Sequence, residues 1–277
     1  MHIVYSEAMN APAQGASPSA AKPAAVVAAW RAAWSALEVR APDPVALADF
    51  ERAHTRTYVE DVFALRVPNG FGTFSKEVNA SLPYTSGALL TAARWALTAK
   101  TAVAAPVSGF HHAGHRMGAD FCTFNGLMVA ALALQAERPG LRIGILDYDY
   151  HYGDGTDDIL EKKQPLSIVH VSAGEHWTRP GQADDFLKAI ATHLEAMADC
   201  DLVLYQAGAD PHVDDPLGGF LTTTQMAQRD WRVFNGLRER GIPVAWVLAG
   251  GYQKPLSKVV DLHVNTMRAA LAAHSDG

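Results

Sequence analysis

The stretch Ile145-Leu146-Asp147-Tyr148-Asp149-Tyr150-His151-Tyr152-Gly153-Asp154-Gly155-Thr156 joins an apolar run to a glycine-rich turn. If the backbone stays extended, Asp147, Asp149 and His151 lie on one side and the intervening tyrosines on the other. Two carboxylates and an imidazole at the end of a buried strand carry a large desolvation cost unless they are compensated. A divalent cation would compensate them, and this ligand set suits zinc at a catalytic site. The competing interpretation is a surface strand end with solvated acids.

Outward from this stretch, short apolar runs alternate with helical patterns. The apolar runs are 3–5, 102–105, 143–146, 167–171, 202–206 and 244–248. The helical patterns between them are 85–99, 124–136, 156–162, 183–197 and 224–240. This alternation predicts an α/β fold, a mainly parallel sheet with helices on both faces. No linker or internal repeat divides residues 1–277, so we expect a single domain.

The N-terminal part reads differently from the rest. Residues 8–29 are rich in Ala, Pro and Ser and predict a loop or a partly mobile segment. A helix is expected to begin within 26–37, where tryptophans recur at helical spacing. A second helix is expected over 42–53, with Asp43 as N-cap and Pro44 at the first helical position.

Composition excludes several classes of protein. The chain has 277 residues, 49% of them hydrophobic, which is enough for a full core. The chain has 23 Lys plus Arg against 29 Asp plus Glu, which gives a net charge of -6. It contains no dense run of basic residues, so we do not expect it to bind nucleic acid. Two cysteines cannot form a disulfide framework. With no secretory signal and no run of about 18 apolar residues, we expect a cytoplasmic protein that neither enters nor binds a membrane.

Chemically competent side chains also follow the other apolar runs. Asp210, after Gly208-Ala209, is the candidate third metal ligand. His111-His112 can supply a general base and a companion, with Asp147 and Asp154 as the carboxylates that orient them. Tyr252, after Gly250-Gly251, can donate a hydrogen bond to a developing oxyanion. Together these groups suit metal-assisted hydrolysis of an amide.

These motifs, in this order, resemble the zinc-dependent histone deacetylase family, including its bacterial amidohydrolases, which shares the arginase/deacetylase fold. The resemblance implies one zinc ion held by Asp149, His151 and Asp210. It makes His112 the general base with His111 as its partner, oriented by Asp154 and Asp147, and Tyr252 the group that polarises the carbonyl. It also implies a potassium ion beneath the zinc, held by carbonyls of residues 147–151, with Ser172 fitting that site.

Several positions depart from the family pattern or bear on its substrate tunnel. Tyr152 stands where most members have a second histidine, and Asp120 stands where a glycine beside the acyl-lysine tunnel is usual. Phe121 is retained as one tunnel wall. Arg179 replaces the second aromatic wall, with Trp177 as the substitute. An apolar residue at position 217, here Leu217, resembles the lysine-deacetylase branch of the family.

The predicted substrate is an acylated lysine in a peptide or protein, or an acylated small amine. Three other interpretations stay open. The first is an acetylpolyamine amidohydrolase. Asp214 and Asp215 support it, because such enzymes tend to have an acidic residue near this position that contacts the second ammonium group of the polyamine. The 210–214 segment reads as the DxHxD pattern of binuclear manganese ureohydrolases. A non-catalytic protein that binds acyl-lysine or a small molecule on the same scaffold is the third.

Overall fold

The computed structural model describes residues 1–15, 17–165 and 167–274. Within them a seven-stranded sheet has the order β2-β1-β3-β7-β6-β4-β5, and all neighbouring strands are parallel. The strands are β1 (His2–Val4), β2 (Glu38–Arg40), β3 (Ala102–Ala104), β4 (Ile143–Asp147), β5 (Ile168–Ser172), β6 (Leu202–Gln206) and β7 (Val244–Val247). The predicted α/β class with a mainly parallel sheet is therefore confirmed.

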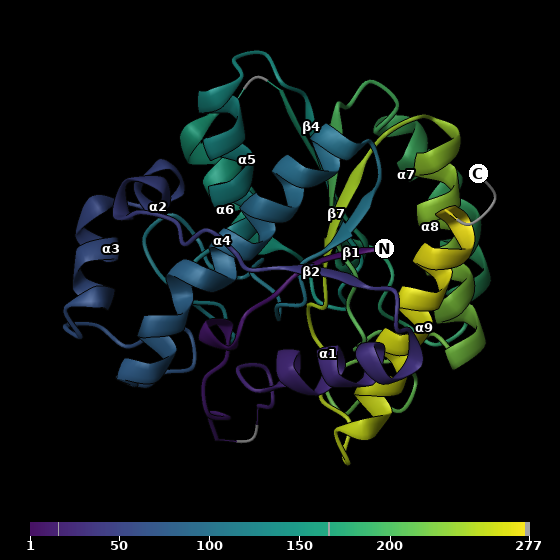
Figure 1. Cartoon of the computed structure of the whole chain (residues 1–277), viewed down its shortest axis with the longest axis horizontal. Helices are drawn as coiled ribbons and strands as arrows, with labels where there is room; N and C mark the ends of the chain where they lie inside the picture. The colour runs from purple at the N-terminus through teal and green to yellow at the C-terminus, as the bar shows by residue number, and fades with distance from the viewer. Residues whose placement is uncertain (16, 166, 275–277) are drawn as a thin grey trace.

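Helices form a layer on each face of the sheet (Figure 1). One layer contains α2 (Leu47–Ala53), α3 (Arg56–Phe63), α4 (Lys76–Ala99), α5 (Gly126–Glu137) and α6 (Asp154–Lys163). The other contains α1 (Lys22–Ala33), α7 (Ala183–Ala196), α8 (Thr223–Glu239) and α9 (Ser257–His274). Short 3-10 helices occur at Glu7–Met9 and Ala173–Glu175. Among the described helices, none combines the length and apolar character needed to cross a bilayer.

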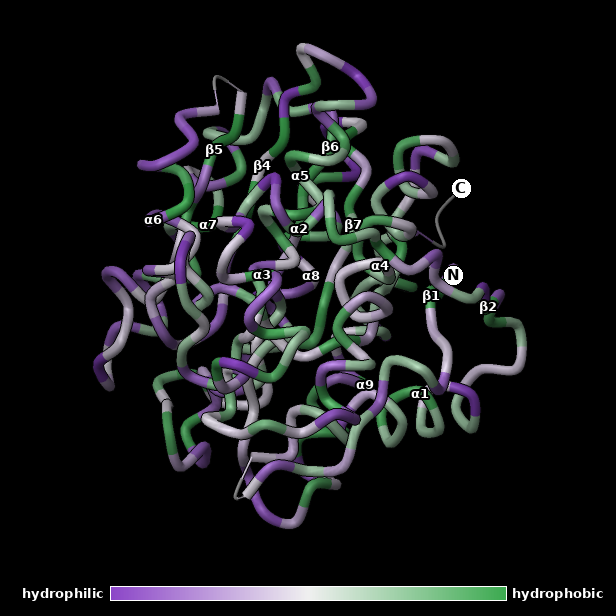
Figure 2. Tube along the Cα trace, turned by 90° about the vertical axis from the view of Figure 1, so that its left-hand side faces the viewer, coloured by the Kyte–Doolittle hydropathy of each residue, from purple (hydrophilic) through white to green (hydrophobic). Residues whose placement is uncertain are grey.

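The interior strands show why the apolar runs predicted the sheet well. Every residue of β3, β4, β6 and β7 is buried. A parallel strand covered on both faces needs such a continuous apolar run. Figure 2 shows hydrophobic segments running through the interior of the molecule, with hydrophilic segments mainly towards its periphery. All six apolar runs of the sequence are strands.

The edge strand β2 and the helices α3 and α9 were not predicted. In β2 only the central Val39 is partly buried, and its two neighbours are exposed. A three-residue edge strand has no continuous apolar run, because only one of its faces meets the core. Strand β2 is held in the sheet by its pairing with β1, a contact that its own sequence does not indicate.

The prediction of a loop over residues 8–29 is wrong at its C-terminal end. Helix α1 already begins at Lys22, with Pro23 in its first turn. Alanine is the strongest helix former and proline is tolerated in the first turn, so this Ala-rich stretch suits a helix despite its lack of charge periodicity. Helix α1 lies beside α9 (Figure 1), and the indole of Trp30 donates to the His263 carbonyl at 3.0 Å.

The helix predicted over residues 42–53 is wrong at its start. Helix α2 begins at Leu47, and the backbone N–H of Ala46 donates to the Asp49 carboxylate at 3.1 Å. The predicted cap, Asp43, precedes Pro44, and a residue before proline is disfavoured in the helical region. The Val45 N–H instead donates to the Pro83 carbonyl of α4 at 3.1 Å. The chain therefore docks on α4 before it turns into the helix.

We predict that Trp30→Ala destabilises the protein strongly. Trp30 is fully buried and packs against Trp246 of β7 at a ring-centroid distance of 5.3 Å. Truncating a buried tryptophan costs about 3–5 kcal/mol of the free energy of unfolding. The matched control is Trp231→Ala, because Trp231 is 48% exposed on α8; its change should stay within roughly 0.5 kcal/mol. Urea unfolding of both variants measures the difference, and equal stabilities would show that residues 22–33 are not docked as described.

Candidate active site

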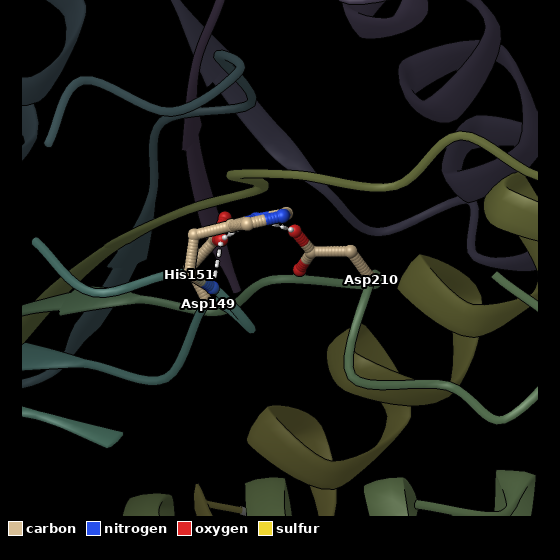
Figure 3. A group of neighbouring side chains, drawn as sticks. All are labelled: Asp149, His151 and Asp210. Carbon is tan, nitrogen blue, oxygen red and sulfur yellow. Dashed lines mark hydrogen bonds and ion pairs between the residues drawn. The ribbon is translucent and has the colours of Figure 1, made fainter. Parts of the chain in front are cut away.

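Three side chains at the carboxyl edge of the sheet form a cluster that can hold a metal ion. Asp149 and His151 follow β4, and Asp210 follows the neighbouring strand β6. His151 Nδ1 lies 3.2 Å from Asp149 Oδ1 and 3.2 Å from Asp210 Oδ2. One ligand atom from each residue lies within 4.8 Å of the others. Figure 3 shows the His151 ring extending across the space between the two carboxylates.

The electrostatics of the cluster favour a cation. Burial, together with the charge of Asp149, raises the pKa of Asp210 to about 7. Burial would also raise the pKa of Asp149, but the charge of His111 and the hydrogen bond from His151 hold it well below its usual value. Burial opposes protonation of His151, yet its hydrogen bonds to Asp149 and Asp210 raise its pKa to about 11. Two buried carboxylates that face one imidazole are thus a fitting donor set for a divalent ion such as zinc.

The segment after β7 completes the cluster through its backbone. The Gly250 N–H donates to Asp149 Oδ2 at 2.8 Å. A Cβ atom at position 250 would lie 2.2 Å from Asp210 Oδ2 and 2.8 Å from Asp149 Oδ2. Only glycine permits this close approach, which gives Gly250 of the Gly250-Gly251-Tyr252 motif a physical role.

The adjacent histidines each contact a separate carboxylate. His111 Nδ1 lies 2.7 Å from Asp147 Oδ2, and His112 Nδ1 lies 2.7 Å from Asp154 Oδ1. An ionised carboxylate only accepts, so each Nδ1 carries the donated proton. Asp147 is itself fixed by the Gln206 amide at 3.1 Å. The predicted pairing of Asp147 with the first histidine and Asp154 with the second is present in the structure.

The two histidines differ in charge preference. Burial disfavours the charged form of His111, but the charges of Asp147 and Asp149 outweigh it and raise the pKa of His111 to about 9. Burial and then the charge of His111 lower the pKa of His112. A neutral His112 beside a charged His111 is the arrangement that a general base and its partner need. Both rings line the same cavity as Asp149.

Tyr252 is positioned by two residues that the sequence analysis did not single out for this role. The carboxylate of Asp215, which is 6% exposed, accepts the Tyr252 N–H at 2.7 Å. The fully buried Lys22 donates through Nζ to the carbonyls of Ala249, at 2.5 Å, and of Gly250, at 3.3 Å. Ala249 has a left-handed φ of 56°, an uncommon conformation for a residue other than glycine. Lys22 therefore stabilises the turn that leads to Tyr252.

Two cavities meet at Phe121 and Tyr252. The inner cavity contains His111, His112 and Asp149 and extends towards Ser19 and α4. The outer cavity opens beyond the two rings and is lined by Leu217 and Pro216. The Phe121 and Tyr252 ring centroids lie 5.7 Å apart. Phe121, predicted as a tunnel wall, lines both cavities, and Leu217 lines the outer one. Trp177, the third predicted tunnel residue, lines neither cavity and packs against Phe186 at 6.1 Å.

Comparison with known proteins identifies the family. The model of the histone deacetylase domain matches residues 19–176 and 175–267. The chain belongs to the histone deacetylase domain family. Among solved structures, the HDA15 HD domain is similar with a TM-score of 0.77 and 21% identity, covering 98% of this chain and 91% of that one. The fold is thus that of the deacetylase domain.

Curated relatives match over part of their length. An uncharacterized protein of Picosynechococcus sp. is 33% identical over 179 residues, which cover 58% of this chain and 60% of that protein. Acetylpolyamine amidohydrolase 2 of Pseudomonas aeruginosa is 26% identical over 177 residues, covering 52% of this chain and 48% of the relative. The matched part therefore spans about half the length of these relatives.

The departures from the deacetylase pattern have local structural explanations. Asp120 and Phe121 both have positive φ, 44° and 70°, between Ala119 and Cys122, whose backbones pair with each other. A turn with two left-handed residues favours glycine, which explains why glycine is usual at position 120. Tyr152 donates to Asp157, which also contacts His170 Nδ1 at 2.7 Å. Tyr152 therefore belongs to a side cluster rather than to the metal site.

Ser172 ends β5 and pairs with Asp147 of β4. Its hydroxyl accepts the Gly153 N–H at 3.0 Å. This contact ties the end of β5 to the turn that carries Asp154, and it does not test the expected potassium ion, which stays a prediction.

His54 and Asn125 anchor the histidine loop, and neither was singled out by the sequence analysis. The Asn125 N–H donates to His54 Nε2 at 2.9 Å, so His54 is neutral and its Nδ1 donates to the Gly114 carbonyl at 2.8 Å. The Asn125 amide in turn donates to the Ala113 carbonyl at 3.2 Å. Both residues are distant in sequence from what they hold, so only the fold reveals them.

We predict that His54 makes stability depend on pH. Burial lowers the pKa of His54 to about 3, against an unfolded value near 6.5. As pH falls, His54 is therefore protonated in the unfolded chain before it is protonated in the folded one. Its contribution to the free energy of unfolding is complete above pH about 6.5 and is lost as pH falls towards 3. Between pH 7 and pH 5, the free energy of unfolding of the wild type should fall by about 2 kcal/mol more than that of His54→Gln. Urea unfolding of both proteins at the two pH values checks this, and a constant gap would contradict it.

Proposed function

We propose that the protein is a zinc-dependent deacetylase that hydrolyses the amide of acetyl-lysine or of a related acylated amine. One observation carries the proposal. One cavity is lined by His111 and His112, each paired with a carboxylate, by Asp149 of the Asp149/His151/Asp210 cluster, and by Tyr252. This arrangement combines a general base, a candidate metal site and a hydroxyl donor, which is what amide hydrolysis requires.

Asp149, His151 and Asp210 would hold the zinc ion. When bound, zinc would act as a Lewis acid on the amide carbonyl and make water more acidic. The cluster offers two carboxylates and one imidazole without a thiolate, and three protein ligands of these types are what a catalytic zinc site uses.

The chain's own groups supply the proton transfers. His112 Nε2, held by the Nδ1 contact to Asp154, takes a proton from the attacking water. The Tyr252 hydroxyl donates a hydrogen bond to the carbonyl oxygen as its charge grows. Burial keeps the pKa of Tyr252 far above its usual value, so the phenol stays protonated and can donate. The histidine pair then returns a proton to the leaving amine.

The structure disfavours two of the other interpretations. For a binuclear ureohydrolase, His212 should be free to bind metal, but its Nε2 contacts Thr223 Oγ1 at 2.9 Å and its Nδ1 accepts the Asp214 N–H at 3.1 Å. For a polyamine enzyme, Asp214 or Asp215 should meet a second ammonium; the Asp215 carboxylate is buried against the Tyr252 and Leu217 N–H groups, which leaves only the exposed Asp214 for that contact. The similarity to an acetylpolyamine amidohydrolase keeps acylated small amines as a second candidate substrate class.

We predict that Tyr252→Phe lowers kcat by roughly 100- to 1,000-fold, because one oxyanion donor is removed. Zinc content, measured by mass spectrometry, should not change, since the hydroxyl is not a ligand. Tyr152→Phe is the matched control and should keep its activity, because Tyr152 contacts Asp157 outside the cavity. Full activity of zinc-loaded Tyr252→Phe would refute the assigned role.

We predict that Asp149→Ala loses tightly bound zinc. The substitution removes one of three ligand side chains and the acceptor of the Gly250 N–H. Asp184→Ala, at the exposed first turn of α7, removes a carboxylate without touching the site and should bind one zinc ion. Equilibrium dialysis with zinc measures both. Stoichiometric, tight zinc in Asp149→Ala would overturn the ligand assignment.

A further inference from the structure

The outer cavity carries charged side chains of both signs. Asp214, Lys254 and Lys258 line it together with the apolar wall of Phe121 and Leu217. All three charged residues are exposed. In the described part of the chain, no ion pair engages any of these three side chains. The rim of the cavity is therefore free to interact with a ligand.

The outer cavity also adjoins the inner cavity. Phe121 and Tyr252 line both cavities, so we take the space beside these two rings as the path of a substrate chain to the inner site. An acylated side chain threaded there leaves its head group in the outer cavity, beside Asp214 and the two lysines. The head group would meet one carboxylate and two ammonium groups.

We propose that the outer cavity recognises a substrate head group that bears a carboxylate next to an amine, as in free Nε-acyl-lysine. This inference rests on the proposed function and adds the substrate class. Lys254 and Lys258 complement the carboxylate, and Asp214 complements the ammonium. A polyamine or a basic peptide instead brings further positive charge towards two lysines, which is unfavourable.

The size of the effect is modest because the groups are exposed. Exposed ion pairs are individually weak, so the two lysines together should change kcat/KM for a carboxylate-bearing substrate by roughly two- to thirtyfold. Salt screens such contacts, so the preference should shrink as ionic strength rises.

Three substrates isolate the carboxylate. Nε-acetyl-lysine, its carboxamide and N-acetylcadaverine present the same acylated chain and the same amine. The second replaces the carboxylate with a neutral amide, and the third lacks it altogether. We expect zinc-loaded protein to show kcat/KM several-fold higher for acetyl-lysine than for the other two. Equal values for all three would overturn the inference.

Variants assign the preference to the rim. The double substitution Lys254→Gln and Lys258→Gln should abolish the advantage of acetyl-lysine over its carboxamide while leaving N-acetylcadaverine turnover intact or higher. Lys188→Gln, at an exposed lysine of α7 outside both cavities, is the matched control and should retain the advantage. Retention in the double variant would contradict the assignment.

The outcomes separate this inference from the proposed function. Hydrolysis of acetyl-lysine peptides without a preference for the free carboxylate refutes only the head-group assignment. A preference for N-acetylcadaverine would identify the polyamine class instead. No hydrolysis of any amide by zinc-loaded protein contradicts the proposed function and this inference together.

Discussion

Three buried carboxylates at one edge of the sheet impose the constraint on which the site depends. Asp147 ends β4, Asp149 follows it, and Asp210 follows β6. All three are at least 97% buried. Their charges are balanced by the imidazoles of His111 and His151, by the Gly250 N–H and by the Gln206 amide. The oxygen and nitrogen donors that Asp149, Asp210 and His151 bring together are what make a divalent cation a fitting occupant.

The parallel topology brings these groups together. Strands β3, β7, β6 and β4 are neighbours in the sheet, and their carboxyl ends lie at one edge. The histidine pair, Tyr252, Asp210 and the Asp149 segment each follow one of these strands. The hydrolytic groups therefore come from four distant parts of the chain, and the sheet fixes their separation.

Much of this arrangement could be predicted from the sequence, because each strand that leads into the site is a continuous apolar run and each chemical group follows one of these strands. Contacts between segments that are distant in the sequence could not be predicted in this way. Lys22 and Ala249 are 227 residues apart, and a lysine in an Ala-rich stretch gives no sign that it is buried. Helix starts were also missed, since α2 begins where Val45 has docked on α4 rather than at the first capping residue. Tertiary contacts decided these positions.

Chemistry and substrate choice occupy different parts of the molecule. The inner cavity is built from strand ends and buried groups, whereas the outer cavity is lined by the loop after Asp210 and by residues 252–258. Asp215 connects the two regions, because it lies in the loop after Asp210 and its carboxylate accepts the N–H of Tyr252. A change in the exposed rim can thus alter the substrate without disturbing the buried site.

The most direct test of the central claim is hydrolysis of acetyl- and trifluoroacetyl-lysine peptides by purified protein with one equivalent of zinc, with and without chelator. The account predicts turnover that chelator abolishes and that zinc restores. Turnover that persists after complete removal of metal, or zinc-loaded protein that hydrolyses none of these peptides, acetyl-lysine or acetylated polyamines, would contradict it.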